Sequence, residues 1–496
     1  MPDRNLLLSR FFLFSVFSLY YASFCMYGFN FWDEGGIYYG GIRYLRGESV
    51  ITDFFGYAAG RYLIVEAVYR LFGQEMINVR YVFALLSASL PFLAFMIARR
   101  IMPLPFAVAA AVLVLSAPAV YYQRFYGFVY LFNAFAFMLF LEDKKQFPWV
   151  IIGGLFAYYL KVETLIFLIP LYIFLAWRVT EGRGRALKVL AIATTFIVVY
   201  INSKYYEFVY FRVVNEIGLW SNSFPSLFGS YQGREFGFIG FFENLLFYLP
   251  FITAILLGFI SLRYFSKDHI KRDQLLILAY LQMAALALVV SRAGFDNLIR
   301  CLPLFFIVSP FLVHFLISRA RPEAVQRFRR GAAEFLLAIY LYDFNFAHGF
   351  YAGSIGTVLR NRVKVESGLA KGVYTNKTDA NIIFGLTKWI EQETDPGDPI
   401  FTVPLNPILY YLTDRVNPTR YDWLLPGTLR SQAEEMDVIK SLNSTRPKII
   451  ILVDIDIDNR EERSLKRYVP SIVGWIVNNY SYSGRVAFFQ VWRQKK

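Results

Sequence analysis

Long apolar runs recur along the first 347 residues of the chain, separated by shorter polar stretches. A membrane-spanning helix needs about 20 mostly apolar residues, within a range of roughly 17 to 25. We expect a spanning helix from each of eleven runs: 11–29, 78–98, 104–122, 126–141, 147–160, 164–178, 188–203, 241–262, 274–291, 301–318 and 332–347. Residues 147–178 are interpreted as two spans because Lys161 and Glu163 interrupt the run, and charged side chains are costly inside a bilayer. The pattern predicts a polytopic α-helical membrane protein with about eleven spans.

Composition supports a membrane protein. Hydrophobic residues make up 56% of the 496 positions, charged residues only 18%, and the mean hydropathy is +0.41, whereas soluble domains carry about 25% charged residues. The net charge of +14 is typical of nucleic-acid-binding proteins, but here Lys and Arg cluster between apolar runs, as membrane orientation requires. We therefore expect the lipid bilayer as a partner and no nucleic acid.

The basic clusters fall on every second loop between the expected spans. They are Arg4 and Arg10, Arg99 and Arg100, Lys144 and Lys145, 183–188, 263–272 and 319–330. Because Lys and Arg favour cytoplasmic loops, the N-terminus is expected in the cytoplasm of a cell with an inner (plasma) membrane. Asp33, Glu34, the loop 204–240 and everything after residue 347 are then extracytoplasmic. A signal peptide is the alternative for the first run, but that run lacks a clear small-residue cleavage site.

Three regions lie outside the expected spans. The loop 30–77 contains two amphipathic helical patterns, 37–45 and 62–72, which favour helices along the membrane surface. The aromatic-rich loop 204–240 is interpreted as an external lid. Residues 348–496 are expected to form a small soluble α/β domain, with strands at 400–403, 448–453 and 486–492 and helices at 378–394, 430–442 and 466–479. The predicted domains are thus a membrane module, 1–347, and an extracytoplasmic domain, 348–496.

Candidate chemistry begins with Asp33 and Glu34, directly after the first apolar run. A carboxylate can accept the proton of a hydroxyl or amine acceptor. Cations on the same face run against the positive-inside bias and indicate an anionic substrate, whose departing phosphate they would stabilise. These cations are Arg61, Arg124, Lys161, Arg292 and Arg300.

The first external loop resembles that of bacterial GT-C glycosyltransferases, including the protein O-mannosyltransferase and aminoarabinose transferase superfamily. The resemblance rests on Asp33-Glu34-Gly35, Tyr38 and Tyr39, Arg43 to Gly47, Asp53-Phe54-Phe55, Gly60-Arg61-Tyr62 and Leu71-Phe72-Gly73. Similar later landmarks are Ser116-Ala117-Pro118 to Arg124, Gly154 to Lys161, Arg300-Cys301-Leu302-Pro303 and, in the tail, Trp389 to Asp398 and Leu409 to Thr413.

The resemblance implies a GT-C fold and an inverting transfer of a sugar from a polyprenyl-phosphate donor to an acceptor on the outer, periplasmic face. It implies Asp33 as the general base, with Glu34 ordering it or binding acceptor or metal. Arg124, Lys161, Arg61 and Arg300 would bind the donor phosphate. The acceptor, whether lipid, glycan or protein, stays open, although the chain lacks the large luminal insert of eukaryotic protein mannosyltransferases.

A metal site based on histidine or cysteine is not expected. The chain has only His269, His314 and His348, and Cys25 and Cys301 both lie in apolar runs. Carboxylates and phosphate could still hold a divalent cation, Mg or Mn, without such a signature. No cofactor is therefore assigned.

Other interpretations stay open. Asp33 and Glu34 could cap a surface helix, Arg61, Arg124 and Arg300 could be interfacial anchors, and Lys161 could pair with Glu163. A lipid-linked sugar ligase or polymerase would also place these charges at one face. A transporter or flippase of lipid-linked sugars should show repeated halves and interrupted helices, which the sequence lacks, and a non-enzymatic assembly partner would not need converging acidic and basic residues.

Overall fold

The computed structural model describes most of the 496 residues, in two compact units. Outside the description lie 1–3, 32–33, 51, 57, 117–123, 162, 180–237, 291–301, 320–354, 427, 430, 457–460, 462–463 and 496. Unit 1 comprises Met1–Cys25 and Tyr81–Leu359, and unit 2 comprises Met26–Arg80 and Arg360–Lys496. The expected lid loop falls outside the described residues, apart from its last three positions, which begin a helix.

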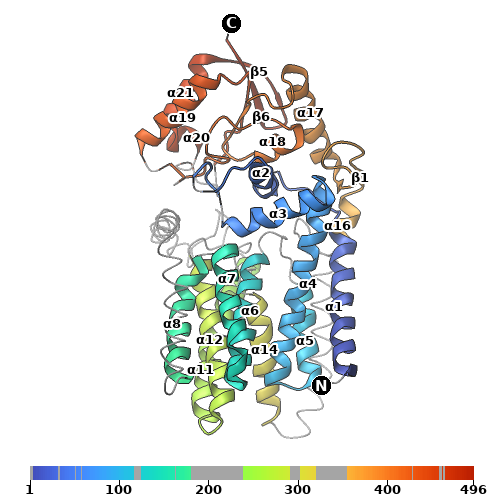
Figure 1. The fold of residues 1–496 in the computed structure, drawn as a ribbon, viewed down its shortest axis with the longest axis vertical. Coiled ribbons are helices and arrows are strands. Elements are labelled where there is room, and N and C mark those ends of the chain that lie inside the picture. Colours follow the sequence, from blue (N-terminus) through green and yellow to red (C-terminus); the bar gives the residue numbers. More distant parts are fainter. Residues whose placement is uncertain are drawn as a thin grey trace. The chain divides into compact units, whose positions relative to one another are not determined.

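Unit 1 is a bundle of helices (Figure 1). They are α1 (Arg4–Phe24), α4 (Met76–Ile101), α5 (Leu104–Ser116), α6 (Arg124–Glu142), α7 (Phe147–Lys161), α8 (Glu163–Val179), α11 (Phe238–Tyr264), α12 (His269–Val290) and α14 (Leu302–Ile317). Nine of the eleven predicted spans coincide with these helices. The other two, 188–203 and 332–347, lie outside the described residues. The prediction of two separate helices in 147–178 is confirmed.

Two of the described helices are long and apolar enough to cross a membrane by length and composition. They are Met76–Ile101 and Phe125–Glu142, and shorter apolar helices occur at Leu104–Leu115, Tyr248–Tyr264 and Leu302–Ile317. The count of about eleven spans and the direction of the N-terminus therefore stay predictions.

A buried amide ties three helices of unit 1 together. Asn133 of α6 donates to the carbonyl of Gly153 in α7 over 3.1 Å, and its Oδ1 accepts from the Tyr172 hydroxyl of α8 at 3.2 Å. A Cβ at Gly153 would lie 2.6 Å from this Oδ1, so the glycine permits the close approach. Small residues and interhelical hydrogen bonds of this kind are typical of packing between membrane helices.

Unit 2 combines two helices of the first external loop with the C-terminal region. The helices are α2 (Glu34–Leu45) and α3 (Ala59–Phe72). The C-terminal elements, beginning with the boundary helix α16, are α16 (Ile355–Arg360), β1 (Val363–Lys364), β2 (Tyr374–Thr375), α17 (Lys377–Glu393), β3 (Phe401–Val403), α18 (Pro407–Thr413), α19 (Gln432–Thr445), β4 (Ile449–Leu452), α20 (Leu465–Tyr468), α21 (Pro470–Asn479), β5 (Tyr480–Val486) and β6 (Phe489–Gln494).

The main sheet of unit 2 has the order β3-β4-β6-β5, with β3 parallel to β4 and the other pairs antiparallel. The core of this region joins apolar residues of β3 and β4 to those of α19 and α21, among them Val403, Ile450, Leu442 and Ile476. Strands and helices therefore alternate as the sequence predicted for an α/β region.

Two element boundaries differ from the sequence prediction. The single strand expected at 486–492 is the turn and second arm of a hairpin, in which Ala487 adopts a positive φ of 53° between β5 and β6. The single helix expected at 466–479 is two, because Pro470 starts α21. Proline fits the first turn of a helix, where its missing N–H is not needed.

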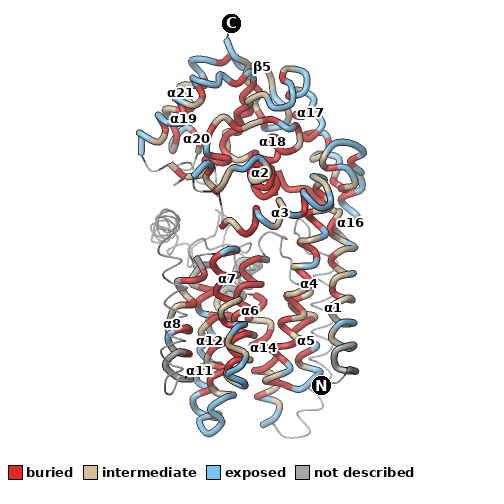
Figure 2. Tube along the Cα trace, viewed as in Figure 1, coloured by how far each residue is buried: buried red, intermediate tan, exposed pale blue. Residues whose placement is uncertain are grey.

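Residues 30–77 belong to the same compact unit as the C-terminal region, whereas the sequence pattern predicted them as part of the membrane module. The reason is the surface of α2, which is buried over most of its length (Figure 2). A Cβ at Gly35 would lie 2.1 Å from the backbone nitrogen of Ile408 in α18, and one at Gly40 would lie 2.3 Å from the ring of Tyr62 in α3. Glycine in a helix costs roughly 0.5–1 kcal/mol relative to alanine, and here it allows both neighbours to approach α2 closely.

Candidate functional site

Glu34 is the first residue of α2 and is almost fully buried, with 4% of its surface exposed. The Arg80 guanidinium, which has no exposed surface, holds it in a two-pronged ion pair. Arg80 Nε donates to Oε1 at 2.8 Å and Nη2 donates to Oε2 at 2.9 Å. The Tyr38 hydroxyl, one turn along α2, donates to Oε1 at 2.5 Å. Asp33 directly precedes this residue in the chain and lies outside the described residues.

The contacts of Glu34 limit what it can do chemically. Both carboxylate oxygens accept charge-assisted or hydroxyl hydrogen bonds inside a buried setting, and removing one partner of such a pair leaves an uncompensated charge. Acting as a base would protonate Glu34 and remove the charge that pairs with the buried Arg80 guanidinium, and a metal ion bound there, as the family resemblance offered, would lie beside that positive charge. Its geometry therefore fits a residue that orders its neighbour.

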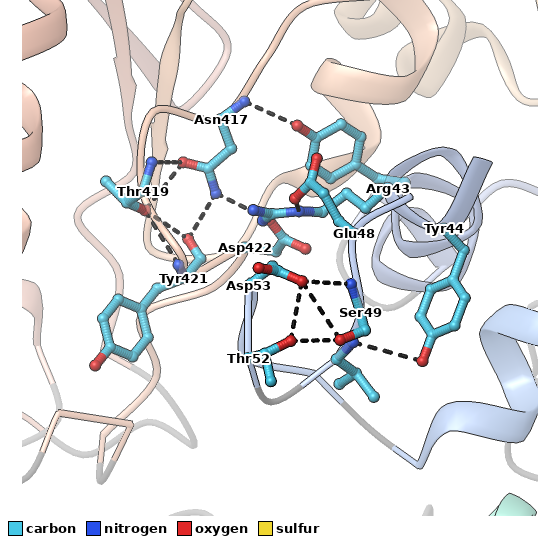
Figure 3. Close-up of polar contacts among 12 residues, drawn as sticks. Arg43, Tyr44, Glu48, Ser49, Thr52, Asp53, Asn417, Thr419, Tyr421 and Asp422 are labelled. Carbon is cyan, nitrogen blue, oxygen red and sulfur yellow. Dashed lines mark hydrogen bonds and ion pairs between the residues drawn. The ribbon is translucent and has the colours of Figure 1, made fainter. Parts of the chain in front are cut away.

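A second buried ionic network joins α2 to the segment between α18 and α19 (Figure 3). Arg43 Nη1 donates to Asp422 Oδ1 at 2.6 Å, and Arg43 Nε donates to Glu48 at 2.6 Å. The Asn417 side chain also donates to Asp422 Oδ1, at 2.9 Å, and its backbone N–H donates to the Tyr39 hydroxyl at 2.8 Å. These bonds fix α2 at its second half.

Burial sets the titration behaviour of this network. Asp422 is 1% exposed, and burial raises the pKa of its carboxyl while the Arg43 charge lowers it. Burial also raises the pKa of the Tyr39 hydroxyl, which keeps Tyr39 neutral. The ring centroids of Tyr38 and Tyr411 lie 5.2 Å apart. Those of Tyr39 and Tyr410 lie 4.9 Å apart. Aromatic packing and ion pairing thus hold the same helix.

Asp53 forms a turn after α2. Its Oδ2 accepts from the Ser49 backbone N–H at 2.8 Å and from the Thr52 hydroxyl at 2.9 Å. These bonds hold the pKa of the Asp53 carboxyl below its usual range. They support the interpretation of Asp53 as a turn residue.

We expect the turn to loosen only in acid. A carboxyl whose pKa is lowered by folding stabilises the folded form above its unfolded pKa of about 3.9, and this contribution is lost as the pH falls through the lower folded value. The amide-exchange protection of Ser49 should therefore stay constant from neutral pH down to about 4 and fall below it. In Asp53→Ala the amide-exchange protection of Ser49 should be low over the whole pH range. Unchanged protection in that variant would contradict the assignment.

The structure places the expected phosphate-binding cations in different units. Arg61, in the first turn of α3, is 3% exposed and belongs to unit 2 together with Glu34. Lys161 ends α7 in unit 1 and is 4% exposed, with its Nζ 3.8 Å from the ring centroid of Tyr126. Arg300 lies outside the described residues.

Arg124 and Lys161 belong to the same end of a helix pair, as the first residue of α6 and the last residue of α7. The antiparallel helices α6 and α7 are joined by the short 3₁₀ turn Lys144–Gln146. Arg124 begins α6, two residues before Tyr126, whose ring Lys161 contacts. This end combines the N-terminus of α6 with the C-terminus of α7, whose dipole ends carry opposite partial charges, so the two cationic residues are what favours an anion here.

The described residues contain no group of three or more His, Cys, Asp or Glu side chains that could hold a metal ion.

Sequence reasoning missed Arg80 and Asp422. Arg80 lies in the apolar run 78–98, where a charged residue is itself a signal of function. The sequence does not indicate that its partner lies 46 positions earlier. Asp422 lies in a stretch without regular periodicity, and its pairing with Arg43 over 379 positions has no local signal.

No protein-family model matches the sequence, and no curated protein matches it. Solved structures do match. ArnT from Cupriavidus metallidurans in the apo state has a TM-score of 0.54 at 14% identity, with 98% of both chains covered. The same protein bound to undecaprenyl phosphate matches with a TM-score of 0.46 at 12% identity, with 97% of both chains covered. A third match is the archaeal oligosaccharyltransferase AglB from Archaeoglobus fulgidus, in complex with an inhibitory peptide and a dolichol-phosphate. Its TM-score is 0.48 at 11% identity, with 100% of this chain and 75% of that chain covered.

The match to apo ArnT extends over nearly the whole chain, from α1 through the C-terminal sheet. ArnT is an aminoarabinose transferase and a GT-C glycosyltransferase. This chain therefore has the GT-C fold of ArnT, and the resemblance expected from its first external loop is confirmed at the level of the fold.

Proposed function

We propose that this protein is an integral membrane glycosyltransferase that moves a sugar from a polyprenyl-phosphate donor to an acceptor on the outer face of the membrane. The observation that carries the proposal is the acidic pair at the start of α2. Glu34 is fully engaged by Arg80 and Tyr38, so Asp33 is the member of the pair that is assigned proton transfer. The GT-C fold supports this assignment.

In the proposed reaction, the Asp33 carboxylate accepts the proton of the acceptor hydroxyl or amine. The acceptor oxygen or nitrogen bonds to the anomeric carbon as the bond from that carbon to the phosphate oxygen breaks. The electron pair of the broken bond leaves with the polyprenyl phosphate, and the configuration at the anomeric carbon is inverted. A positioned base contributes about 10²–10⁴-fold to such a step.

The departing phosphate gains negative charge and needs cations nearby. Arg124 and Lys161, at the shared end of α6 and α7, are the first candidates, and Arg61 and Arg300 are assigned the same role. Lys161 lies against Tyr126 in a buried setting, where charge interactions are stronger than in water. The loop 30–77 and the C-terminal region are placed on the outer face, where the acceptor arrives.

The function is tested by incubating the purified protein with a panel of polyprenyl-phosphate sugars and lipid-linked oligosaccharides, together with lipid, glycan and protein acceptors. We expect one donor to be consumed with release of polyprenyl phosphate. Consumption only of a lipid-linked oligosaccharide would identify a ligase or polymerase instead. Movement of donors across a vesicle membrane without chemical change would identify a flippase and overturn the proposal.

Arg124→Ala is expected to weaken binding of polyprenyl phosphate by about 2 kcal/mol, or roughly 30-fold, through loss of a charge-assisted contact. Isothermal titration of detergent-solubilised protein with polyprenyl phosphate measures the affinity. The matched control is Lys144→Ala, which removes an exposed cation at the opposite end of the same helix pair. Equal affinities of the two variants would favour the interpretation of Arg124 as an interfacial anchor.

A further inference from the structure

Arg80 contacts the chain on both sides of Asp33. Its Nη2 donates to the Gly28 carbonyl oxygen at 3.0 Å, and its Nε and Nη2 bind the Glu34 carboxylate at 2.8 and 2.9 Å. Gly28 lies five positions before Asp33, and Glu34 follows it directly. One guanidinium, with no exposed surface, thus bridges the two ends of the segment that carries the proposed base.

The described residues that precede Asp33 are also held in place. The Gly28 backbone N–H donates to the Tyr374 carbonyl at 2.8 Å, and the Tyr374 N–H donates to the Met26 carbonyl at 2.8 Å. Phe29 and Phe31 are buried, and their rings lie 4.9 Å apart. Gly28 is therefore anchored to β2, and Arg80 binds Gly28 and Glu34 on either side of Asp33 in the chain.

An arginine suits this bridge for a geometric reason. The guanidinium is planar and presents several N–H donors in a fixed fork, whereas a lysine ammonium is a single point charge on a flexible stem. Here two nitrogens bind the carboxylate, and one of them also binds a backbone carbonyl. A buried ion pair contributes little net stability compared with apolar residues of similar volume, so the arrangement is better explained by the position that it enforces.

We propose that Arg80 is a positioning residue for Asp33, acting through its bonds to Gly28 and Glu34, which are described residues on either side of the base in the chain. This inference rests on the proposed function for its catalytic consequence. Misplacement of a reacting group by about 1 Å can cost roughly 100-fold in rate. Removing the bridge should therefore lower turnover without weakening donor binding.

The test compares Arg80→Met, Arg80→Lys and Glu34→Gln with wild type. The matched control is Arg70→Met, which breaks an exposed ion pair with Glu66 on α3 of the same unit. We expect kcat to fall about 100-fold in Arg80→Met and by a smaller factor in Arg80→Lys and Glu34→Gln. The affinity for polyprenyl phosphate should not change, and Arg70→Met should retain wild-type turnover.

Hydrogen exchange gives a measurement that does not depend on activity. We expect the backbone amides of residues 28–34 to exchange faster in all three test variants, with the exchange of the C-terminal sheet unchanged. If Arg80→Met does not fold, Arg80→Lys and Glu34→Gln still decide the question. In an Asp33→Asn background, Arg80→Met should cause no further loss of residual activity.

Three results would overturn the proposal. Wild-type exchange at 28–34 in Arg80→Met would show that the residue does not hold the segment. A loss of donor affinity at unchanged kcat would make Arg80 a phosphate ligand, and faster exchange throughout unit 2 in Arg80→Lys would make it a general stabiliser. If wild type consumes no donor while the exchange results are as expected, the proposed function is wrong, but the role of Arg80 in holding Gly28 and Glu34 is still supported.

Discussion

Asp33→Asn is expected to lower kcat for sugar transfer by about 1000-fold while donor binding is retained. The amide keeps the size of the side chain but cannot accept the acceptor proton, and general-base catalysis contributes about 10²–10⁴-fold. Steady-state assays with the identified donor measure kcat, and titration with polyprenyl phosphate measures binding.

The control for this variant is Asp53→Asn. Asp53 is a second carboxylate of the same external loop, and its Oδ2 is bound within the turn 49–53. The Asp53→Asn variant should keep kcat within about threefold of wild type, since surface substitutions have small effects. Full activity of Asp33→Asn, or an equal loss in Asp53→Asn, would remove the assigned role of Asp33.

Asp422→Ala is expected to destabilise unit 2 by about 3 kcal/mol, because it leaves the Arg43 charge buried without its more deeply buried partner. Arg43 is 5% exposed, and among the described residues Glu48 is the ion-pair partner that remains after the change. For a unit of this size the loss corresponds to a drop of about 6–12 °C in Tm. Thermal unfolding followed by the fluorescence of tryptophans such as Trp423 and Trp492 measures the shift.

Asp398→Ala provides the comparison. Asp398 pairs with Lys448 over 3.0 Å at the surface, where the lysine side chain is 58% exposed. Exposed pairs contribute about 0–1 kcal/mol, so its Tm should fall by a few degrees at most. An Asp422→Ala shift no larger than this would show that the Arg43 network does not hold α2 in place.

Hydrophobic periodicity and loop charge predicted much of the fold. The runs 78–98 and 126–141 correspond to α4 and α6, and the amphipathic patterns 37–45 and 62–72 correspond to α2 and α3. These elements are local: each is determined by the apolar pattern of its own residues. The hairpin at 486–492, predicted as a single strand, shows that periodicity does not locate tight turns. The turn at Ala487 leaves the apolar pattern almost unbroken.

The arrangement of the site could not be predicted in the same way. Glu34 was recognised as an acidic neighbour of Asp33, but the bond to Arg80 depends on where the start of α4 lies against α2. The grouping of α2 with the C-terminal region depends on the missing side chain of Gly35, which lets Ile408, distant in the sequence, approach α2 closely. Such pairings are set by tertiary packing, which the residue pattern along the sequence does not reveal.

The anomeric configuration of the product tests the central claim most directly. When Asp33 acts as a base in a single displacement, the acceptor attacks the face of the sugar opposite the phosphate, and the product has the configuration opposite to that of the donor. We expect NMR coupling constants of the purified product of the wild-type enzyme to show inversion. Retention of configuration would indicate a covalent sugar–enzyme intermediate and would contradict the account of Asp33 as a general base.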